Sequence, residues 1–229
     1  MKIKPKLLPR HENARLAFAK RHQRWTYQWD KVLFSDESSF EYNKQYPKYA
    51  YRHRGEAMKK GMFIPKKATY GKKYLKVWAC ISANGPGPLV FLEERWNRHS
   101  YKKILEENLL TAGRSLIGND FVFMQGNLNF LFLDGDTVHD SQLVKNWLKK
   151  QKVKCLEWAA CSPDLNPIEN LWFWVKRTLS KETYSQEEFK EKIRSAWGQV
   201  TPELCRQLYD SMPRRMTKVI SSEGQVTKY

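Results

Sequence analysis

Apolar and polar positions divide the chain into short strand-like runs and longer helix-like stretches. β-Branched and aromatic runs bounded by polar residues or glycine predict strands, and apolar positions three or four apart predict helices. Strands are expected at 31–35, 39–42, 74–82, 89–92, 121–124, 130–133 and 153–156. Helices are expected at 11–22, 100–116, 139–150, 167–179, 186–197 and 202–212. Strands come first, then strands alternating with helices, then helices alone. This order predicts an α/β fold, a mixed sheet flanked by helices.

Two strand connections are expected to be tight. Residues 39–42 are predicted to fold back on 31–35 as a hairpin, and the turn Asn84-Gly85-Pro86-Gly87 is predicted to join strands 74–82 and 89–92.

Three carboxylates lie where elements begin or end. Asp36 ends the apolar run 32–35, Asp134 follows the run 130–133, and Glu169 falls in the first turn of an amphipathic helix. Mg²⁺ prefers hard oxygen ligands, and two such ions can activate an attacking hydroxyl and stabilise a leaving oxygen in phosphoryl transfer. Together the three acids predict a divalent-metal site.

Each acid also has a structural interpretation. Glu169 is the third residue after the N-cap candidate Asn166, as in a capping box. Asp36 can belong to a turn. Asp136 and Asp140 are alternative candidates for the ligand role of Asp134. Glu37 is expected to point to the opposite face of its strand from Asp36.

The charge balance indicates a polyanionic partner. The 229 residues include 41 Lys and Arg against 24 Asp and Glu, a formal net charge of +17. Lys and Arg displace counterions from phosphates, which favours a nucleic acid. Between residues 44 and 76 there are eleven basic residues and one acid, with aromatic residues interleaved. This basic arm, 44–73, suits contact with phosphates or a partner subunit. Its DNA-binding candidates are Arg52, Arg54, Lys59, Lys60, Lys66, Lys67, Lys72 and Lys73.

Other function classes find little support. The four cysteines show no C-x-x-C spacing, which favours reduced thiols in an intracellular protein. A zinc site of Cys155, Cys161 and His139 lacks a fourth ligand and a recognisable spacing. No run is long enough to span a membrane, no signal peptide opens the chain, and no glycine-rich phosphate loop occurs.

From about Leu8 to Tyr229 the chain resembles the catalytic region of the mariner superfamily of DNA transposases. The most specific stretch is Ser162-Pro163-Asp164-Leu165-Asn166-Pro167-Ile168-Glu169-Asn170-Leu171-Trp172. The other matching stretches are His11–Lys20, Val32–Ser38, Arg54–Glu56, Val77–Ser82, Gly87–Phe91, Ser211–Arg215 and Thr227–Tyr229.

The resemblance implies a ribonuclease H-like fold. It implies that Asp36, Asp134 and Glu169 hold two Mg²⁺ or Mn²⁺ ions. The family spacing of 34 residues between the second and third acids selects Asp134 over Asp136. His139 matches a family position, although a packing role is equally consistent with it, and Asp136 and Asn170 are candidate site neighbours.

The implied reaction is hydrolytic nicking at transposon ends, followed by attack of a 3′-hydroxyl on target DNA. The implied partners are double-stranded DNA and a second copy of the chain in a dimer on that DNA, and the implied compartment is the nucleus. Residues 1–30 would then be a linker end and the helix leading into the domain, and 31–229 the catalytic domain.

Two departures from the family pattern stand out. After the second acid the family usually has Asn-Ala-Pro, whereas this chain has Gly135-Asp136-Thr137. Deleting residues 126–133 would join Gln125 to Asp134 and restore the family pattern, so we interpret this segment as an insertion. Either 130–133 replaces the original strand, or 121–125 keeps its place and a loop follows it.

The family's two helix-turn-helix modules have no room before Arg10, so this chain alone is not expected to recognise transposon ends. The alternative function is therefore an inactive or domesticated transposase-derived protein that binds DNA or assembles on it. A ribonuclease of the same fold is a weaker third candidate.

Overall fold

The computed structural model describes residues 7–42, 73–92, 96–125, 138–179 and 185–229. The described strands are β1 Val32–Tyr42, β2 Lys73–Ser82, β3 Gly85–Phe91, β4 Val122–Met124 and β5 Lys154–Cys155. The described α-helices are α1 Pro9–His22, α2 Arg98–Ile104, α3 Leu110–Leu116, α4 Gln142–Lys150, α5 Ile168–Thr178, α6 Gln186–Gly198, α7 Pro202–Asp210 and α8 Met212–Ser221. A π-helical segment, Leu105–Leu109, joins α2 to α3.

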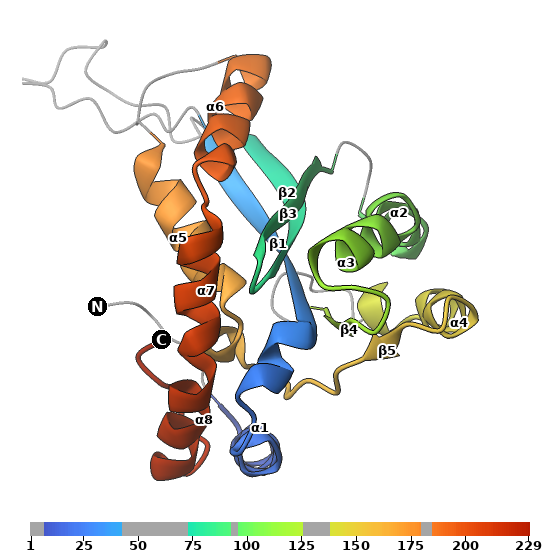
Figure 1. The fold of residues 1–229 in the computed structure, drawn as a ribbon. Coiled ribbons are helices and arrows are strands. Elements are labelled where there is room, and N and C mark those ends of the chain that lie inside the picture. The colour runs from blue at the N-terminus through green and yellow to red at the C-terminus, as the bar shows by residue number, and fades with distance from the viewer. Residues whose placement is uncertain (1–6, 43–72, 93–95, 126–137, 180–184) are drawn as a thin grey trace, which may run out of the picture.

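The five strands form one mixed sheet in the order β3-β2-β1-β4-β5. β1 pairs antiparallel with β2 and parallel with β4, and β4 pairs parallel with β5. Helices cover both faces (Figure 1). The mixed sheet with flanking helices confirms the expected ribonuclease H-like α/β fold.

Strand β1 separates two hydrophobic cores because successive side chains of a strand point to opposite faces. Phe34 and Phe40 belong to the core that α5, α6, α7 and α8 cover. Leu33 belongs to the second core, under α2, α3 and α4. Asp36, at an even position like Phe34, therefore faces α5, and Glu37, at an odd position like Leu33, faces the side of α2, α3 and α4.

The predicted hairpin between 31–35 and 39–42 is wrong. Residues 32–42 form a single eleven-residue strand, whose partner is β2 in a register that runs from Phe34–Ile81 to Tyr42–Lys73. Ser35, Asp36, Glu37 and Ser38 look like a turn by composition, but they are buried in the middle of this strand. Burial against two cores thus overrides the local turn preference of Ser and Asp.

The connection between β2 and β3 is tighter than expected. Ser82 pairs with Gly85, so the turn is Ala83-Asn84 and β3 already begins at Gly85, whose φ is +141°. Pro86 and Pro88 lie inside β3, and proline is tolerated there because β3 is an edge strand.

The end of the chain also differs from expectation. A single helix was expected over 202–212, but α7 ends at Asp210 and α8 follows from Met212. Pro213 fits the first turn of α8, where proline needs no amide hydrogen. Within the described ranges, no helix has the length and apolar character to cross a membrane.

Candidate active site

Asp36 occupies the middle of β1 and faces α5. Its side chain is buried, and the indole Nε1 of Trp172 donates a hydrogen bond of 3.2 Å to Asp36 Oδ2. Burial raises the pKa of Asp36 well above its ordinary value of 3.8, and the nearby charges of Glu169 and Glu37 raise it further. A carboxylate in this position would be stabilised by a cation.

Glu169 enters the same region from the first turn of α5. Asn166 joins this turn to β1, because its Nδ2 donates to the carbonyl oxygen of Ser35 at 3.4 Å. The Asn166 side chain also accepts from the amide of Ile168 at 3.4 Å. Pro167 then supplies a backbone already suited to a helix start.

The structure argues against the capping-box interpretation of Glu169. In a capping box, the third-position acid accepts the amide hydrogen of the N-cap residue. Here the Asn166 amide donates instead to the carbonyl oxygen of Pro163 at 3.1 Å. The Glu169 residue is exposed, and its charge reaches Asp36.

Glu37 lies on the other face of β1, as the alternation predicted, and there it meets His139. Both side chains are buried, with Glu37 Oε2 and His139 Nε2 3.4 Å apart. Within the described ranges neither carboxylate oxygen of Glu37 and neither ring nitrogen of His139 has a hydrogen-bond partner. The Tyr101 ring packs edge-on against the His139 ring, with 4.2 Å between centroids.

β4 ends beside the residue that precedes Asp36. Ser35 Oγ donates to the carbonyl oxygen of Met124 at 3.1 Å, and the last β1–β4 register pair is Phe34–Met124.

Val122–Met124 fills the sheet position between β1 and β5. The alternative in which 130–133 replaces this strand is therefore wrong, and 121–125 keeps its place. Asp134 and Asp136 lie outside the described residues, as does the proposed insertion 126–133. Gln125 Nε2 donates to the carbonyl oxygen of His139 at 3.4 Å, so the described residues on either side of this segment are in contact.

Sequence reasoning missed Lys176, which lies seven residues after Glu169 and hence on the same side of α5. Desolvation lowers the pKa of Lys176, and this outweighs the opposing effects of Glu169 and Asp36. Its Nζ lies 5.3 Å from the centroid of the Phe40 ring. The helical spacing from Glu169 was the signal that could have identified it.

Sequence reasoning also missed two buried arginines, Arg215 beside Asn170 and Arg15 beside Asp164. Arg215 Nη2 donates to Asn170 Oδ1 at 2.7 Å, and Arg215 Nη1 donates to the carbonyl oxygen of Asp164 at 2.7 Å. The carboxylate of Asp164 accepts both terminal nitrogens of Arg15 at 2.7 Å. Nothing in the local sequence distinguishes these arginines from the many exposed ones.

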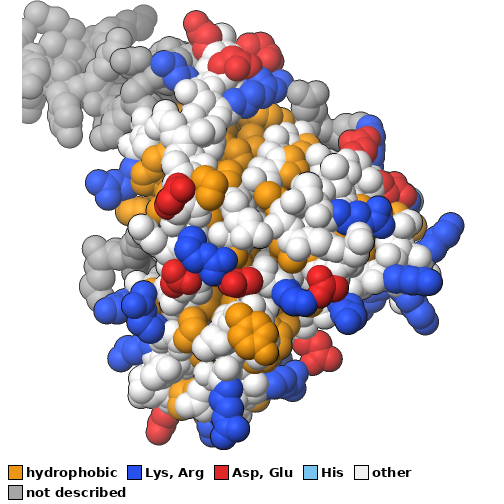
Figure 2. All heavy atoms as spheres, viewed as in Figure 1, with side chains coloured by type: hydrophobic (Ala, Val, Ile, Leu, Met, Phe, Trp, Pro, Cys, Tyr) orange, Lys and Arg blue, Asp and Glu red, His pale blue; other side chains and the backbone are white. Residues whose placement is uncertain are grey.

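The basic arm lies almost wholly outside the described residues, which include only Lys73 of its eight DNA-binding candidates. Lys73 begins β2 and is the register partner of Tyr42. In Figure 2, Lys and Arg side chains gather over the edge formed by α4 and β5. The exposed lysines of that edge are Lys145, Lys149, Lys150, Lys152 and Lys154.

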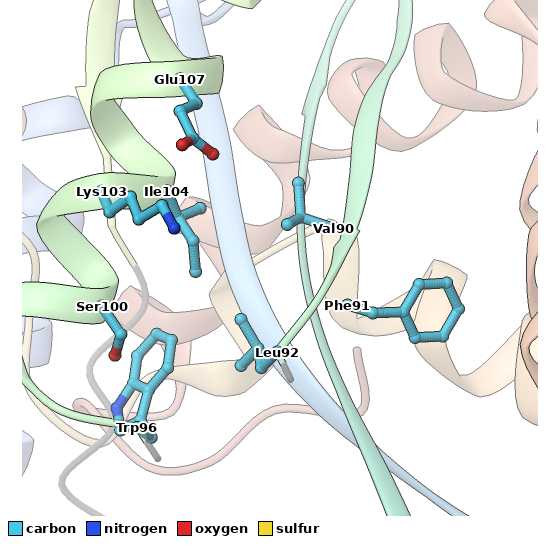
Figure 3. Close-up of a pocket in the computed structure, with 8 residues that line it drawn as sticks. All are labelled: Val90, Phe91, Leu92, Trp96, Ser100, Lys103, Ile104 and Glu107. Atoms are coloured by element: carbon cyan, nitrogen blue, oxygen red, sulfur yellow. The ribbon is translucent and has the colours of Figure 1, made fainter. Parts of the chain in front are cut away.

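A separate hollow of about 180 Å³ lies between β3 and α2. Figure 3 shows Val90 of β3 and Leu92 just after it on one side and Lys103, Ile104 and Glu107 on the other, with Trp96 closing one end. None of the three predicted acids lines it. This hollow is mainly apolar and is not part of the acid cluster.

The fold agrees with comparisons to known proteins. Residues 31–190 match the family model described as DDE superfamily endonuclease. The Transposable element Tc1 transposase of Caenorhabditis elegans is 33% identical over 229 residues, covering 99% of this chain and 81% of that protein. The chain belongs to the Tc1/mariner transposases of the DDE endonuclease superfamily.

Other members agree in sequence and in fold. The Tcb2 transposase of Caenorhabditis briggsae is 32% identical, over 99% of this chain and 81% of that protein. The crystal structure of the catalytic domain of Mos1 mariner transposase superposes with a TM-score of 0.72 at 16% identity, covering 99% of this chain and all of that one. The fold is thus that of a Tc1/mariner catalytic domain.

The donor set of this transposase domain fits a hard divalent cation. Asp36 and Glu169 carry carboxylate oxygens, and burial of Asp36 together with the charges of Glu169 and Glu37 raises its pKa, so a cation there would stabilise the ionised form. The described residues alone hold no group of three or more His, Cys, Asp or Glu side chains placed to bind a metal.

Proposed function

We propose that this chain is the catalytic domain of a DNA transposase that cleaves DNA strands and transfers them in a metal-dependent reaction. One observation carries the proposal: Asp36 is buried on the face of β1 where Trp172 of α5 bonds to it, and the Glu169 charge of α5 acts on it there. The match to the family model described as DDE superfamily endonuclease supports this assignment.

Asp36, Glu169 and Asp134 would hold Mg²⁺ or Mn²⁺, two ions for each site. Solved Mos1 paired-end complexes contain Mn or Mg, which supports this choice. When bound, such ions activate an attacking hydroxyl and stabilise a leaving oxygen.

The protein's own residues would position the two described acids. The Trp172 indole of α5 donates a hydrogen bond to one oxygen of Asp36. The Asn166 side chain keeps the start of α5 against β1. In its protonated form, Lys176 would contact a DNA phosphate beside the acids.

The proposed partners are duplex DNA, both transposon ends and target, and a second copy of the chain on that DNA. Solved Mos1 structures include a pre-cleavage transpososome and a paired-end complex with a transposon end. The chain covers 67% and 66% of the Mos1 chains in those two structures. The eleven basic residues between positions 44 and 76 support contact with DNA, because Lys and Arg displace counterions from phosphates. The nucleus is the proposed compartment.

A nicking assay tests this proposal. The full chain is incubated with supercoiled plasmid and with pre-nicked duplex DNA in Mg²⁺ or Mn²⁺. Asp36→Asn, Asp134→Asn and Glu169→Gln are each expected to lower nicking by about a thousandfold, since a lost metal ligand removes several kcal/mol of transition-state stabilisation. Asp140→Asn, at an exposed carboxylate that pairs with Lys145, is the matched control and should retain activity. Nicking that survives Asp36→Asn or Glu169→Gln contradicts the proposal.

The second candidate, a transposase-derived protein that binds DNA without cleaving it, is favoured by one observation. Val122–Met124 keeps the sheet position next to Asp36, so the proposed insertion lies between that strand and Asp134. DNA binding that falls steeply with salt, together with no nicking by the wild-type chain, would select this function.

A further inference from the structure

We propose that Arg215 and Asn170 position Glu169 for metal binding, and that Asp164, Arg15 and the end of the chain hold Arg215 in place. This proposal rests on the proposed function, because it takes Glu169 as a metal ligand. It adds residues that contact neither metal nor DNA. We call the five groups, Arg15, Asp164, Asn170, Arg215 and the tail 224–229, the arginine clamp.

Arg215 joins three separate segments through one guanidinium group. Its Nε donates to Ser211 Oγ at the start of α8, at 2.9 Å. Its Nη1 donates to the carbonyl oxygen of Asp164 in the 3₁₀ turn before α5, and Nη2 to Asn170 Oδ1 in the first turn of α5, both at 2.7 Å. Asn170 directly follows Glu169, so this bond fixes the turn that carries the acid.

Asp164 is the central acceptor of the clamp. Its two carboxylate oxygens take the terminal nitrogens of Arg15, and Oδ2 also accepts the amide and the hydroxyl of Thr227 at 2.8 and 2.9 Å. Burial alone would raise the pKa of Asp164, but the Arg15 and Thr227 contacts hold it below its ordinary value. The ionised carboxylate therefore has four donors and little freedom to move.

The end of the chain completes the clamp. Arg15 Nε and Nη2 donate to the carbonyl oxygens of Gly224 and Gln225, at 2.8 and 3.1 Å. The Arg215 guanidinium carbon lies 4.9 Å from the centroid of the Tyr229 ring. Gly224 has a φ of +87°, and a Cβ there would lie 2.2 Å from the carbonyl oxygen of Glu12, so only glycine lets the tail approach α1 this closely.

The bonds of Arg215 are shorter than those of Asn166 at the same turn. Arg215 Nη1 and Nη2 donate at 2.7 Å, whereas the two bonds of the Asn166 side chain are each 3.4 Å long. The Arg215 side chain is buried, and in such surroundings charge-assisted bonds of 2.7 Å set geometry strongly. Groups that orient a ligand in this way usually change metal affinity by ten- to a hundredfold.

The test measures Mn²⁺ affinity of the full chain by titration calorimetry, together with hydrogen exchange of the first-turn amides of α5. Asn170→Ala removes the acceptor of Arg215 from a half-buried position. We expect Mn²⁺ affinity about tenfold weaker or more, and faster exchange at Glu169 and Asn170, with the melting temperature nearly unchanged. Asn170→Asp keeps an oxygen acceptor and should restore affinity to within about threefold of wild type.

Arg215→Met tests the other partner, with its exposed neighbour Arg214→Met as the matched control. Arg215→Met should weaken Mn²⁺ binding like Asn170→Ala, and Arg214→Met should leave it unchanged. If Arg215→Met does not fold, the Asn170 pair of variants decides alone. Wild-type Mn²⁺ affinity and wild-type exchange in Asn170→Ala would overturn the positioning role.

Glu169→Gln separates this proposal from the proposed function. Weakened Mn²⁺ binding in Glu169→Gln, with normal binding in Asn170→Ala and Arg215→Met, rejects the arginine clamp and keeps the metal site. Unchanged Mn²⁺ binding in Glu169→Gln, or no binding by the wild-type chain, rejects the metal assignment and the clamp's role with it.

Discussion

The two sides of the acid site are held in opposite ways. On the side of Glu169, the arginine clamp satisfies Asp164 with four donors and links α1, α5, α8 and the tail. On the side of His139, a buried Glu37 carboxylate and a buried imidazole lie 3.4 Å apart without a described hydrogen bond. Buried polar groups normally have partners, so the His139 side is the less stable part.

This difference follows the proposed insertion. The well-bonded side carries the stretch Ser162–Trp172, which keeps the family pattern. On the poorly bonded side, the carbonyl oxygen of His139 accepts a bond from Gln125, the last described residue before the interrupted stretch 126–133. The better-bonded side is therefore the one whose sequence keeps the family pattern.

The largest expected effect is on stability and comes from breaking the clamp. Arg15→Met leaves the Asp164 carboxylate buried without its bidentate partner. Removing one member of a buried ion pair costs about 3–5 kcal/mol of unfolding free energy. Urea unfolding measures this change, with exposed Lys20→Met on the same helix as the control. A loss below about 1 kcal/mol would show that the two sides are equally stable.

The next effect is on activity and comes from the other side. Deleting residues 126–133 places Asp134 directly after Gln125, beside the exit of β4. Misplacement of a reacting group by about 1 Å can cost about a hundredfold in rate. We therefore expect the deletion to raise the nicking rate by about a hundredfold. The control is the same deletion with Asp134→Asn, which should be inactive.

A rate that does not rise on this deletion, in a protein that still folds, would mean that 126–133 is not what limits Asp134.

A smaller effect concerns Asp36 itself. Burial and the charges of Glu169 and Glu37 raise its folded pKa, so its ionised form destabilises the metal-free fold. Asp36→Asn keeps an acceptor for Trp172 and removes that charge. It should raise the melting temperature by about 2–4 °C for each kcal/mol gained in a chain of this size. Differential scanning calorimetry in EDTA measures this, and a lowered melting temperature would contradict it.

The raised pKa of Asp36 predicts that the free energy of unfolding depends on pH. Because the folded pKa of Asp36 lies above the unfolded value of 3.8, the folded state binds more protons between those two pKa values. Its contribution to stability is full below the unfolded pKa and is lost as pH rises through the folded pKa. The difference in unfolding free energy between Asp36→Asn and wild type should therefore grow with pH above about 4. A difference independent of pH would refute the raised pKa.

The smallest effect is expected at the Glu37–His139 pair. Replacing both members with apolar residues, as in Glu37→Leu with His139→Phe, removes two buried polar groups that lack described partners. Such replacements of buried pairs are often neutral or stabilising. We expect a change within about 1 kcal/mol in urea unfolding. If the double variant loses as much unfolding free energy as Arg15→Met, the Glu169 and His139 sides do not differ in stability.

Much of the fold was predictable because its signals are local. Apolar spacing located α1, α5 and α6 to within two residues at each end. The error in β1 has a physical cause. Ser35-Asp36-Glu37-Ser38 favours a turn locally, whereas pairing with β2 and burial between two cores keep it extended.

The candidate site was predictable only in part. The alternation rule placed Asp36 and Glu37 on opposite faces of β1, as the structure has them. The arginine clamp could not be predicted, because Arg15, Asp164 and Arg215 are far apart in sequence and resemble surface residues. The metal-ligand roles of the acids, Asp134 included, remain predictions.

The register pair Tyr42–Lys73 has a practical consequence for the basic arm. Because the two strands meet there in antiparallel register, the arm begins and ends at one point of the sheet. Swapping it for a two-residue Asn-Gly connection would leave every other strand pair unaltered. Evolution could likewise lengthen, shorten or exchange this excursion with little penalty to the rest of the domain, since loop-closure entropy grows slowly with length. The basic arm can therefore be exchanged as a unit, and chimaeras between relatives can be joined at Tyr42 and Lys73.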